Sequence, residues 1–269
     1  MNRTFKLTLA VAASSMLAAS ANLGWAAEIQ TFDTEASAAA AGWTGTDNRV
    51  PAYGTDFGWS NSILAAGASG AGEAGGYFPR HTLPVGSYAD VNIGTASLNQ
   101  PLSASGKIVF FTENLDGGVR LGWFNKDSTD LGVSLPPSVA ISFAEGARFQ
   151  PSVRLQNSNG VSGPLTQPNI GSNVTSFALN WNPATRILSA TFGGVTIDTP
   201  ALSDAQFTLG STMNAFGLFT GASGSDNINS RARVFIDDVT YSVGVPEPAT
   251  LALLAIAASM GLCVRRRTT

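Results

Sequence analysis

The chain has 269 residues, of which 44% are hydrophobic and 12% are charged, with 29 glycines, one cysteine and one histidine. The charged fraction is about half of the ~25% that is usual in globular domains, which argues against a coiled coil or a charged disordered chain. Cys263 alone cannot form an internal disulfide, and a single histidine excludes sites built on two or three histidines.

The first 26 residues have the layout of a secretory signal peptide. Arg3 and Lys6 form a basic region, residues 7–19 form a short apolar region, and small residues follow. This arrangement predicts an exported protein whose signal peptide, within residues 1–26, is cleaved after Ala21 or Ala26.

Residues 28–243 show the pattern of many short β-strands. Apolar and polar residues alternate in segments 119–123, 177–181 and 188–192, as they do in half-buried strands. Glycine, proline and asparagine turns separate these segments, and the only helical pattern is a weak one at residues 34–41. We therefore expect an all-β sandwich or barrel. The last strand is expected to present one apolar face made by Phe235, Val239, Tyr241 and Val243.

The order of the strands resembles the concanavalin A-like, laminin-G-like jelly roll. The segment FALNWNPATRILSATFGGVTID predicts three consecutive strands, which FGLFTG and the final FIDDVTYSV follow. The resemblance implies a jelly-roll β-sandwich over residues 28–243 in which the final strand pairs near the first. Such domains often hold Ca²⁺ through carboxylates and loop carbonyls, but the sequence assigns no ligands to a metal.

The sequence lacks the residue patterns that catalysis needs. No Glu-x-Asp-x-x-Glu pattern is found, and Asp237 and Asp238 are adjacent, so they are expected to point to opposite faces of a strand. His81 is the only imidazole, and no G-x-S-x-G motif accompanies it. We expect that the protein is not an enzyme and needs no organic cofactor.

Aromatic residues in Gly- and Asn-rich segments are the candidates for sugar binding. Trp43 lies in GWTGTDNR and Trp59 in DFGWSNS, where Asn61 adds a hydrogen-bonding side chain. Sugars stack on aromatic rings and take hydrogen bonds from such amides, so these three residues form the predicted glycan site. Packing in the core is the alternative role for both tryptophans. A structural or adhesive matrix protein without a small-ligand site is the alternative function.

The charge balance bears on the partners. Residues 28–245 hold 17 acidic and 10 basic residues, a net charge of about −7. Such a charge predicts no binding to nucleic acid and argues against other polyanions, while it leaves neutral partners open.

The C-terminal segment predicts a membrane helix. Residues 249–264 carry no charge and precede Arg265, Arg266 and Arg267. A helix of this length covers roughly 24 Å, which can cross a bilayer where the bilayer thins or the arginines reach the headgroups. The arginines place this end in the cytoplasm and the main domain outside.

The tripeptide Pro246-Glu247-Pro248, the apolar helix and the arginine cluster together resemble the PEP-CTERM sorting signal of Gram-negative bacteria, over residues 246–269. The resemblance implies recognition by an exosortase, processing of the tail, and a link to exopolysaccharide and biofilm. We therefore expect a protein of the cell envelope, outer surface or extracellular matrix that is transiently anchored in the inner membrane. The predicted role is glycan binding, with exopolysaccharide as the expected partner.

Overall fold

The computed structural model describes residues 28–46, 49–50, 55–65, 72–80, 86–111, 118–128, 136–144, 148–156, 158–168, 173–220 and 227–244. Residues 27–241 form one compact unit. The predicted signal peptide, and the predicted sorting signal with its transmembrane helix, lie outside the described residues. Within the described ranges, no helix is long and apolar enough to span a membrane.

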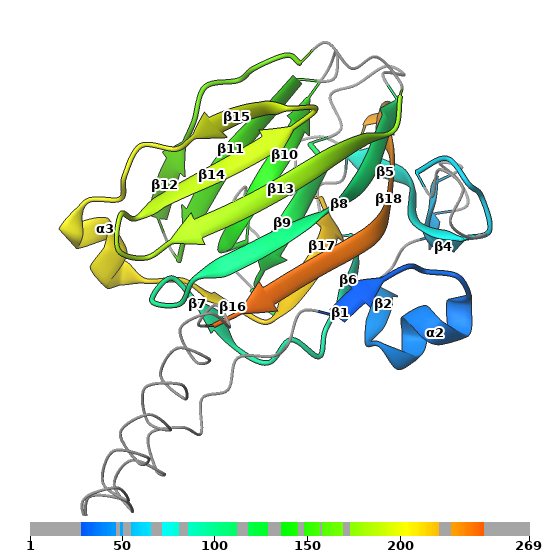
Figure 1. The fold of residues 1–269 in the computed structure, drawn as a ribbon, viewed down its shortest axis with the longest axis horizontal. Coiled ribbons are helices and arrows are strands. Elements are labelled where there is room, and N and C mark those ends of the chain that lie inside the picture. Colours follow the sequence, from blue (N-terminus) through cyan, green and yellow to red (C-terminus); the bar gives the residue numbers. More distant parts are fainter. Residues whose placement is uncertain are drawn as a thin grey trace, which may run out of the picture. The chain divides into compact units, whose positions relative to one another are not determined.

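Two antiparallel sheets contain most of the described strands (Figure 1). The nine-stranded sheet has the order β15 (Val195–Asp198), β14 (Ile187–Phe192), β13 (Thr175–Asn182), β8 (Leu102–Phe111), β18 (Asn227–Val243), β5 (Glu73–Arg80), β4 (Thr55–Ser60) and β3 (Arg49–Val50), and β1 (Glu28–Gln30) also pairs with β18. The seven-stranded sheet has the order β12 (Ser158–Ser162), β11 (Arg148–Leu155), β10 (Ser138–Ala144), β9 (Arg120–Phe124), β17 (Ala215–Phe219), β6 (Ser87–Asp90) and β2 (Trp43–Thr46). A small third sheet pairs β16 (Thr212–Met213) with β7 (Ala96–Ser97). The all-β sandwich expected from the sequence is confirmed.

The first and last described strands pair with each other. Residues 28–30 of β1 lie opposite residues 239–241 of β18, in antiparallel register. The other half of β18 pairs with β5. The expected return of the final strand to the first is therefore confirmed.

Two short helices lie outside the sheets, and a capping box begins each of them. In α2 (Glu35–Ala40), Thr34 accepts a hydrogen bond from the backbone N–H of Ser37, and the Ser37 side chain accepts one from the Thr34 backbone. In α3 (Asp204–Leu209), Ser203 and Gln206 exchange the same pair of bonds. Such boxes satisfy N–H groups that the first turn leaves without partners. The weak helical pattern at residues 34–41 is thus confirmed as α2, whereas α3 was not expected.

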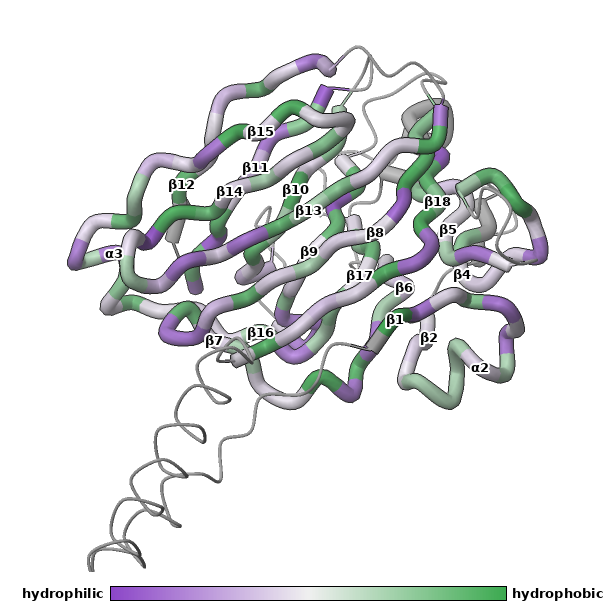
Figure 2. The backbone as a smooth tube through the Cα atoms, in the orientation of Figure 1, coloured by the Kyte–Doolittle hydropathy of each residue, from purple (hydrophilic) through white to green (hydrophobic). Residues whose placement is uncertain are grey.

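Period-two alternation builds the core between the two sheets. The side chains of Phe177, Leu179 and Trp181 in β13 are at most 2% exposed, and the residues between them face outward, as Figure 2 shows by their alternating hydropathy. The Trp181 ring N–H, buried with its side chain, donates to the carbonyl of Leu98 at 2.9 Å. The predicted strand at residues 177–181 is therefore confirmed with its predicted inward face.

Aromatic rings from both sheets meet in this core. Phe192 of β14 lies 5.3 Å from Phe143 of β10 and 5.4 Å from Phe149 of β11, measured between ring centroids. Phe216 of β17 stacks on Tyr241 of β18 with the centroids 4.3 Å apart. Each such pair adds about 0.5–1.5 kcal/mol to the stabilisation from burial alone. The rings therefore fix how the two sheets face each other.

A change of phase within β18 corrects two expectations. Asp238 has a φ of 50°, which interrupts the alternation of the strand. Phe235 packs with Val109 on the outer face of the nine-stranded sheet, whereas Tyr241 stacks on Phe216 between the sheets. The single apolar face predicted for this strand is wrong, because one residue in the left-handed region moves the following side chains to the opposite face.

The same change of phase gathers carboxylates on the outer face. Lys107 pairs with Asp238 at 2.5 Å, and its charge, like those of Asp238 and Glu73, acts on Asp237. Asp237 and Asp238 therefore lie on one side of the strand, contrary to the expectation that they diverge. Glu73 is fully buried and accepts hydrogen bonds from the Ser62 hydroxyl and from the backbone N–H groups of residues 64 and 65.

Replacing Asp237 with asparagine is expected to stabilise the domain at neutral pH. Asp237 is 1% exposed, and burial raises its pKa from 3.8 to about 6. The unfolded chain therefore loses this proton first, so the charge costs nothing below pH 4, costs more as the pH rises to 6, and is constant above. With about 1.4 kcal/mol per pKa unit, we expect a gain of about 2 kcal/mol at pH 7.

Urea unfolding at pH 3.5 and at pH 7 measures this difference. Asp198→Asn is the matched control, because Asp198 is exposed in β15 and its replacement should change stability by less than about 0.5 kcal/mol. An equal effect of Asp237→Asn at the two pH values would contradict the prediction.

Candidate functional site

Three arginines lie on the outer face of the seven-stranded sheet. In β11, Phe149 points into the core against Phe192, so the alternate residues Arg148 and Arg154 face outward. In β9, Trp123 packs against Phe216 in the core, and Arg120 takes the opposite face. The only carboxylate in the strands of this sheet belongs to Asp90, which faces the core and accepts a hydrogen bond from the Tyr241 hydroxyl. The outer face is therefore cationic in an acidic chain.

Small residues form the middle of this face. The register places Ala140, Gly122, Gly217 and Ala89 opposite one another across four neighbouring strands. A Cβ on Gly122 would lie 2.2 Å from the carbonyl oxygen of Val139, and one on Gly217 would lie 2.4 Å from that of Tyr88. No larger residue can take either glycine position without moving a neighbouring strand.

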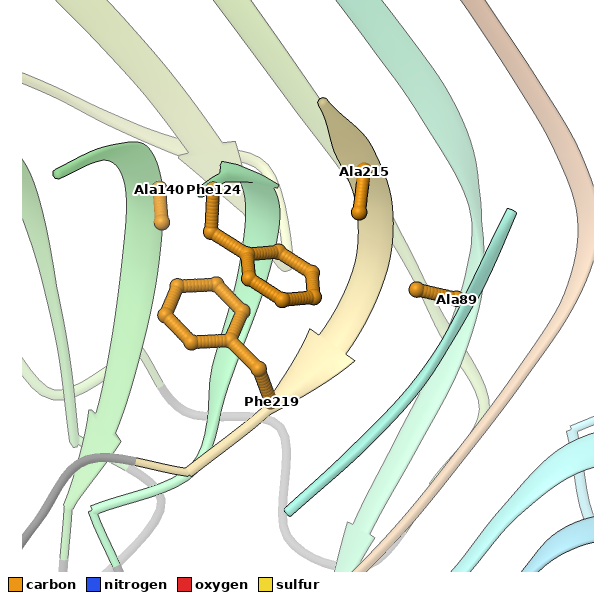
Figure 3. Packing of buried hydrophobic residues seen from close by; sticks show 5 residues of the cluster. All are labelled: Ala89, Phe124, Ala140, Ala215 and Phe219. Carbon is orange, nitrogen blue, oxygen red and sulfur yellow. The ribbon is translucent and has the colours of Figure 1, made fainter. Parts of the chain in front are cut away.

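Two phenylalanines close over these glycines. The rings of Phe124 from β9 and Phe219 from β17 stack at 4.3 Å, and Ala89, Ala140 and Ala215 surround them (Figure 3). Both phenylalanines are fully buried. They therefore form a fixed apolar block beside the polar part of the face and offer no free ring surface.

The polar part of the face follows the register of β9, β10 and β11. One transverse row consists of Arg120, Ser142 and Gln150, all half-buried. In β10 and β11, Ser138 lies opposite Arg154, and Ser152 is the next outward residue of β11. We call these six side chains the arginine face: Arg120, Ser138, Ser142, Gln150, Ser152 and Arg154.

Several polar atoms of the arginine face lack a hydrogen-bond partner. They are the Nε of Arg120 and the hydroxyls of Ser138 and Ser152, and both serines are at most 3% exposed. Buried polar groups in proteins are nearly always hydrogen-bonded, and each one that is not costs about 1–3 kcal/mol. Three such atoms on neighbouring strands of one face indicate donors that are kept for a ligand.

The electrostatics of the face are also unfavourable without a ligand. Burial, followed by the nearby charge of Arg154, lowers the pKa of the Arg120 guanidinium to about 9. Arg120 donates one hydrogen bond, from Nη1 to the carbonyl of Gly118 at 2.9 Å. Two guanidinium groups held close together without a carboxylate weaken each other's charged forms. An acceptor placed between them would relieve this repulsion.

The predicted glycan residues lie elsewhere. Trp43 in β2 is 2% exposed and has rings of Phe32, Tyr88 and other core residues around it, so it has no exposed face for a sugar. Trp59 in β4 is half-buried, and its ring N–H donates to the carbonyl of Phe32 at 2.7 Å. Asn61 follows β4 and is exposed. The structure thus gives Trp43 the core role, and Trp59 and Asn61 remain predicted contacts.

An open hollow lies beside Phe32, near these contacts. It has a volume of about 380 Å³. Its lining comes from β1, α2 and their connections: Ile29, Gln30, Thr31, Phe32, Ser37, Ala40 and Ala41. No charged side chain is among these residues, so the hollow offers little beyond backbone groups and hydroxyls to a ligand.

No calcium site is assembled among the described residues, which contain no group of three His, Cys, Asp or Glu side chains suited to a metal. Asp127, one candidate acid, pairs instead with Lys126 and accepts a hydrogen bond from Asn214 at 2.6 Å. His81, and the sorting-signal residues Pro246, Glu247, Pro248, Arg265, Arg266 and Arg267, lie outside the described residues.

The arginine face was not expected from the sequence. Its local signal is present, because the β11 segment RFQPSVRL alternates polar and apolar residues. The missing information is that β9, β10 and β11 are neighbours, which only the fold provides. The net charge concealed the site, because it averages cations of one face with carboxylates elsewhere.

Comparison with known proteins identifies one motif. Residues 244–267 match the PEP-CTERM protein-sorting motif. The motif marks an exported protein that is anchored in the membrane transiently before an exosortase sorts it. No curated protein shows detectable similarity to the chain.

Solved structures with similar folds include lectins and lyases at low identity. A winged bean acidic lectin complexed with methyl-alpha-D-galactose has 12% identity and a TM-score of 0.45, over 82% of this chain and 100% of the lectin. The alginate lyase Aly36B has 10% identity and a TM-score of 0.44, over 80% of this chain and 96% of the lyase. Cip1, a cellulose induced protein, has 11% identity and a TM-score of 0.44, over 74% and 90%. The chain is a PEP-CTERM sorting-motif protein, and its described domain is an antiparallel jelly-roll sandwich.

Proposed function

We propose that the domain is a glycan-binding module of an exosortase-sorted extracellular protein, and that the exopolysaccharide of the producing cell is its ligand. The observation that carries this proposal is the set of buried, unpartnered polar atoms on the arginine face. Hydroxyl and guanidinium donors on a rigid sheet are groups that bind the many oxygen atoms of a sugar chain. The sorting motif places the protein where it can meet such polymers.

The geometry of the face suits an extended ligand. Arg120, Ser142 and Gln150 form a row that runs across three strands, and neighbouring strands lie about 4.8 Å apart. The row therefore extends over roughly 10 Å, about the length of two sugar units. Gln150 is oriented by a hydrogen bond from its Nε2 to the carbonyl of Gly163 at 2.7 Å, which leaves its side-chain oxygen for a sugar hydroxyl.

A bulky side chain in this row is expected to abolish glycan binding. Ser142→Phe places a ring between Arg120 and Gln150, so the affinity of the full chain for the producer's polysaccharide should fall at least about tenfold. Affinity electrophoresis in gels that contain the polysaccharide measures this loss. Ser189→Phe is the matched control, because Ser189 is a half-buried serine on the outer face of β14 in the other sheet.

The result separates this proposal from the alternative of a structural or adhesive matrix protein. That alternative is favoured by the core position of Trp43, which removes one predicted sugar platform. If the wild-type chain is not retarded by the polysaccharide at millimolar sugar concentrations, the glycan-binding proposal is wrong. Equal loss of binding in both serine variants would also contradict it.

A further inference from the structure

We propose that the arginine face selects acidic glycans, so that its ligand carries carboxylate or sulfate groups and one of these groups binds between Arg120 and Arg154. This inference rests on the proposed function and specifies its ligand class. It reverses the expectation of neutral partners that the net charge supports. Three observations on the face carry it.

The first observation is the segregation of charge. Arg120, Arg148 and Arg154 all take the outer side of the sheet, and no carboxylate in its strands faces them. Elsewhere in the described residues, cations are paired: Lys107 with Asp238, Lys126 with Asp127 and Arg186 with Asp204. The fold therefore places acids beside its other cations and leaves them out of this face.

The second observation concerns Arg120 itself. Its side chain is half-buried, its Nε has no partner, and its one hydrogen bond goes to a neutral carbonyl. A guanidinium presents paired N–H donors that match the two oxygens of a carboxylate or sulfate. A neutral sugar hydroxyl could accept one hydrogen bond from Arg120, but it would leave the charge of the guanidinium uncompensated.

The third observation is the pair of serines. Ser138 lies directly opposite Arg154, and Ser152 follows at the next outward position of β11, with both hydroxyls unpartnered. These hydroxyls can donate to further oxygens of an anionic group that the arginines hold. Together the four side chains form a compact set of donors in which no acceptor of negative charge interferes.

A nucleic acid is a poorer match to the same chemistry. Single-stranded nucleic acids are bound through aromatic rings on which bases stack, and Phe124 and Phe219 on this face are fully buried. The chain is also acidic overall, with a net charge of −3, which repels a long polyphosphate. An acidic glycan carries its charges farther apart along the chain and needs only one or two arginines for each contact.

The test compares two polymers that share one backbone. The full chain is titrated with polygalacturonate and with carboxyl-reduced polygalacturonate, and a poly-dT oligonucleotide serves as the polyphosphate probe. We expect binding to the acidic polymer to be at least about tenfold tighter than to the reduced one, and to weaken as NaCl rises from about 0.05 to 0.5 M. Oligonucleotide binding is expected to be the weakest of the three.

Variants locate the preference. Arg120→Gln and Arg154→Gln should each lower the affinity for polygalacturonate about tenfold and the affinity for the reduced polymer less than about threefold. Arg186→Gln, which removes an arginine that is paired with Asp204 outside this face, should change neither. Because Arg120→Gln removes a buried charge, its melting temperature should not fall, so lost binding cannot be attributed to unfolding.

Each outcome has a separate meaning. Equal binding of the acidic and reduced polymers overturns this inference but supports the proposed function. A preference for acid that survives both arginine substitutions also overturns it, because the anionic group then binds elsewhere. Tighter binding to the oligonucleotide than to polygalacturonate replaces the glycan with a nucleic acid, and no binding to any polymer, including the producer's own, contradicts the proposed function as well.

Discussion

Replacing Gly122 with alanine is expected to destabilise the domain by about 3 kcal/mol or more. The added Cβ would lie 2.2 Å from the carbonyl oxygen of Val139 and 2.7 Å from the Cα of Ala140, both on the neighbouring strand β10. Gly122 also has a φ of 153°, which a residue with a Cβ rarely adopts. Neither neighbour is a flexible side chain that could move away, so β9 and β10 must separate.

Urea unfolding of the full chain measures this loss, and Gly94→Ala is its control. Gly94 has a φ of 70°, but a Cβ there would meet no atom within 4 Å. That substitution should therefore cost only the roughly 1 kcal/mol of the left-handed backbone. The prediction fails if the two alanine variants unfold with free energies within about 1 kcal/mol of each other.

The effect of Gly122 on binding follows from its place on the face. Gly122 and Gly217 let Phe124 and Phe219 stack over the sheet beside Arg120 (Figure 3). A shift of β9 would move Arg120 relative to Ser142, its neighbour on β10. A Gly122→Ala chain that remains folded should therefore also bind glycan more weakly, because positioning as well as chemistry decides affinity.

Much of the fold follows from short-range periodicity in the sequence. Segments 119–123, 177–181 and 188–192 show their inward faces directly, since a strand alternates its side chains whatever its partners are. The phase change in β18 does not follow from periodicity, because it depends on one backbone dihedral at Asp238. Aspartate tolerates the left-handed region better than most residues, so two adjacent aspartates in a strand are the available signal for such a change.

The candidate site shows the opposite limit. Local alternation gives the face of each residue, so Arg120, Arg148 and Arg154 can each be placed opposite an apolar neighbour. Their convergence depends on β10 lying between β9 and β11, which is a property of the sheet order. Net charge pointed to neutral partners because it contains no spatial information. The tryptophans misled for a related reason, because the four-residue strand β2 is too short to show periodicity.

Replacing Trp43 with alanine is expected to destabilise the domain by about 3–5 kcal/mol, a large part of the stability of a typical domain. Trp43 is 2% exposed, and its ring lies 4.7 Å from Phe32, 5.7 Å from Tyr88, 6.2 Å from Tyr241 and 6.4 Å from Phe216, measured between centroids. Tyr241 belongs to the nine-stranded sheet and Phe216 to the seven-stranded one, so the cavity would open where the two sheets meet.

Trp43→Phe is the matched control for this loss. The Trp43 ring N–H has no hydrogen-bond partner, so phenylalanine removes volume but no hydrogen bond, and we expect a cost of only about 1–2 kcal/mol. Chemical unfolding measures both variants, and glycan affinity is measured on the Trp43→Phe chain. Unchanged affinity with reduced stability is the result that a core residue predicts. A Trp43→Ala chain within about 1 kcal/mol of wild type would instead mean that the ring packs against nothing essential, and that its sugar-binding role must be reconsidered.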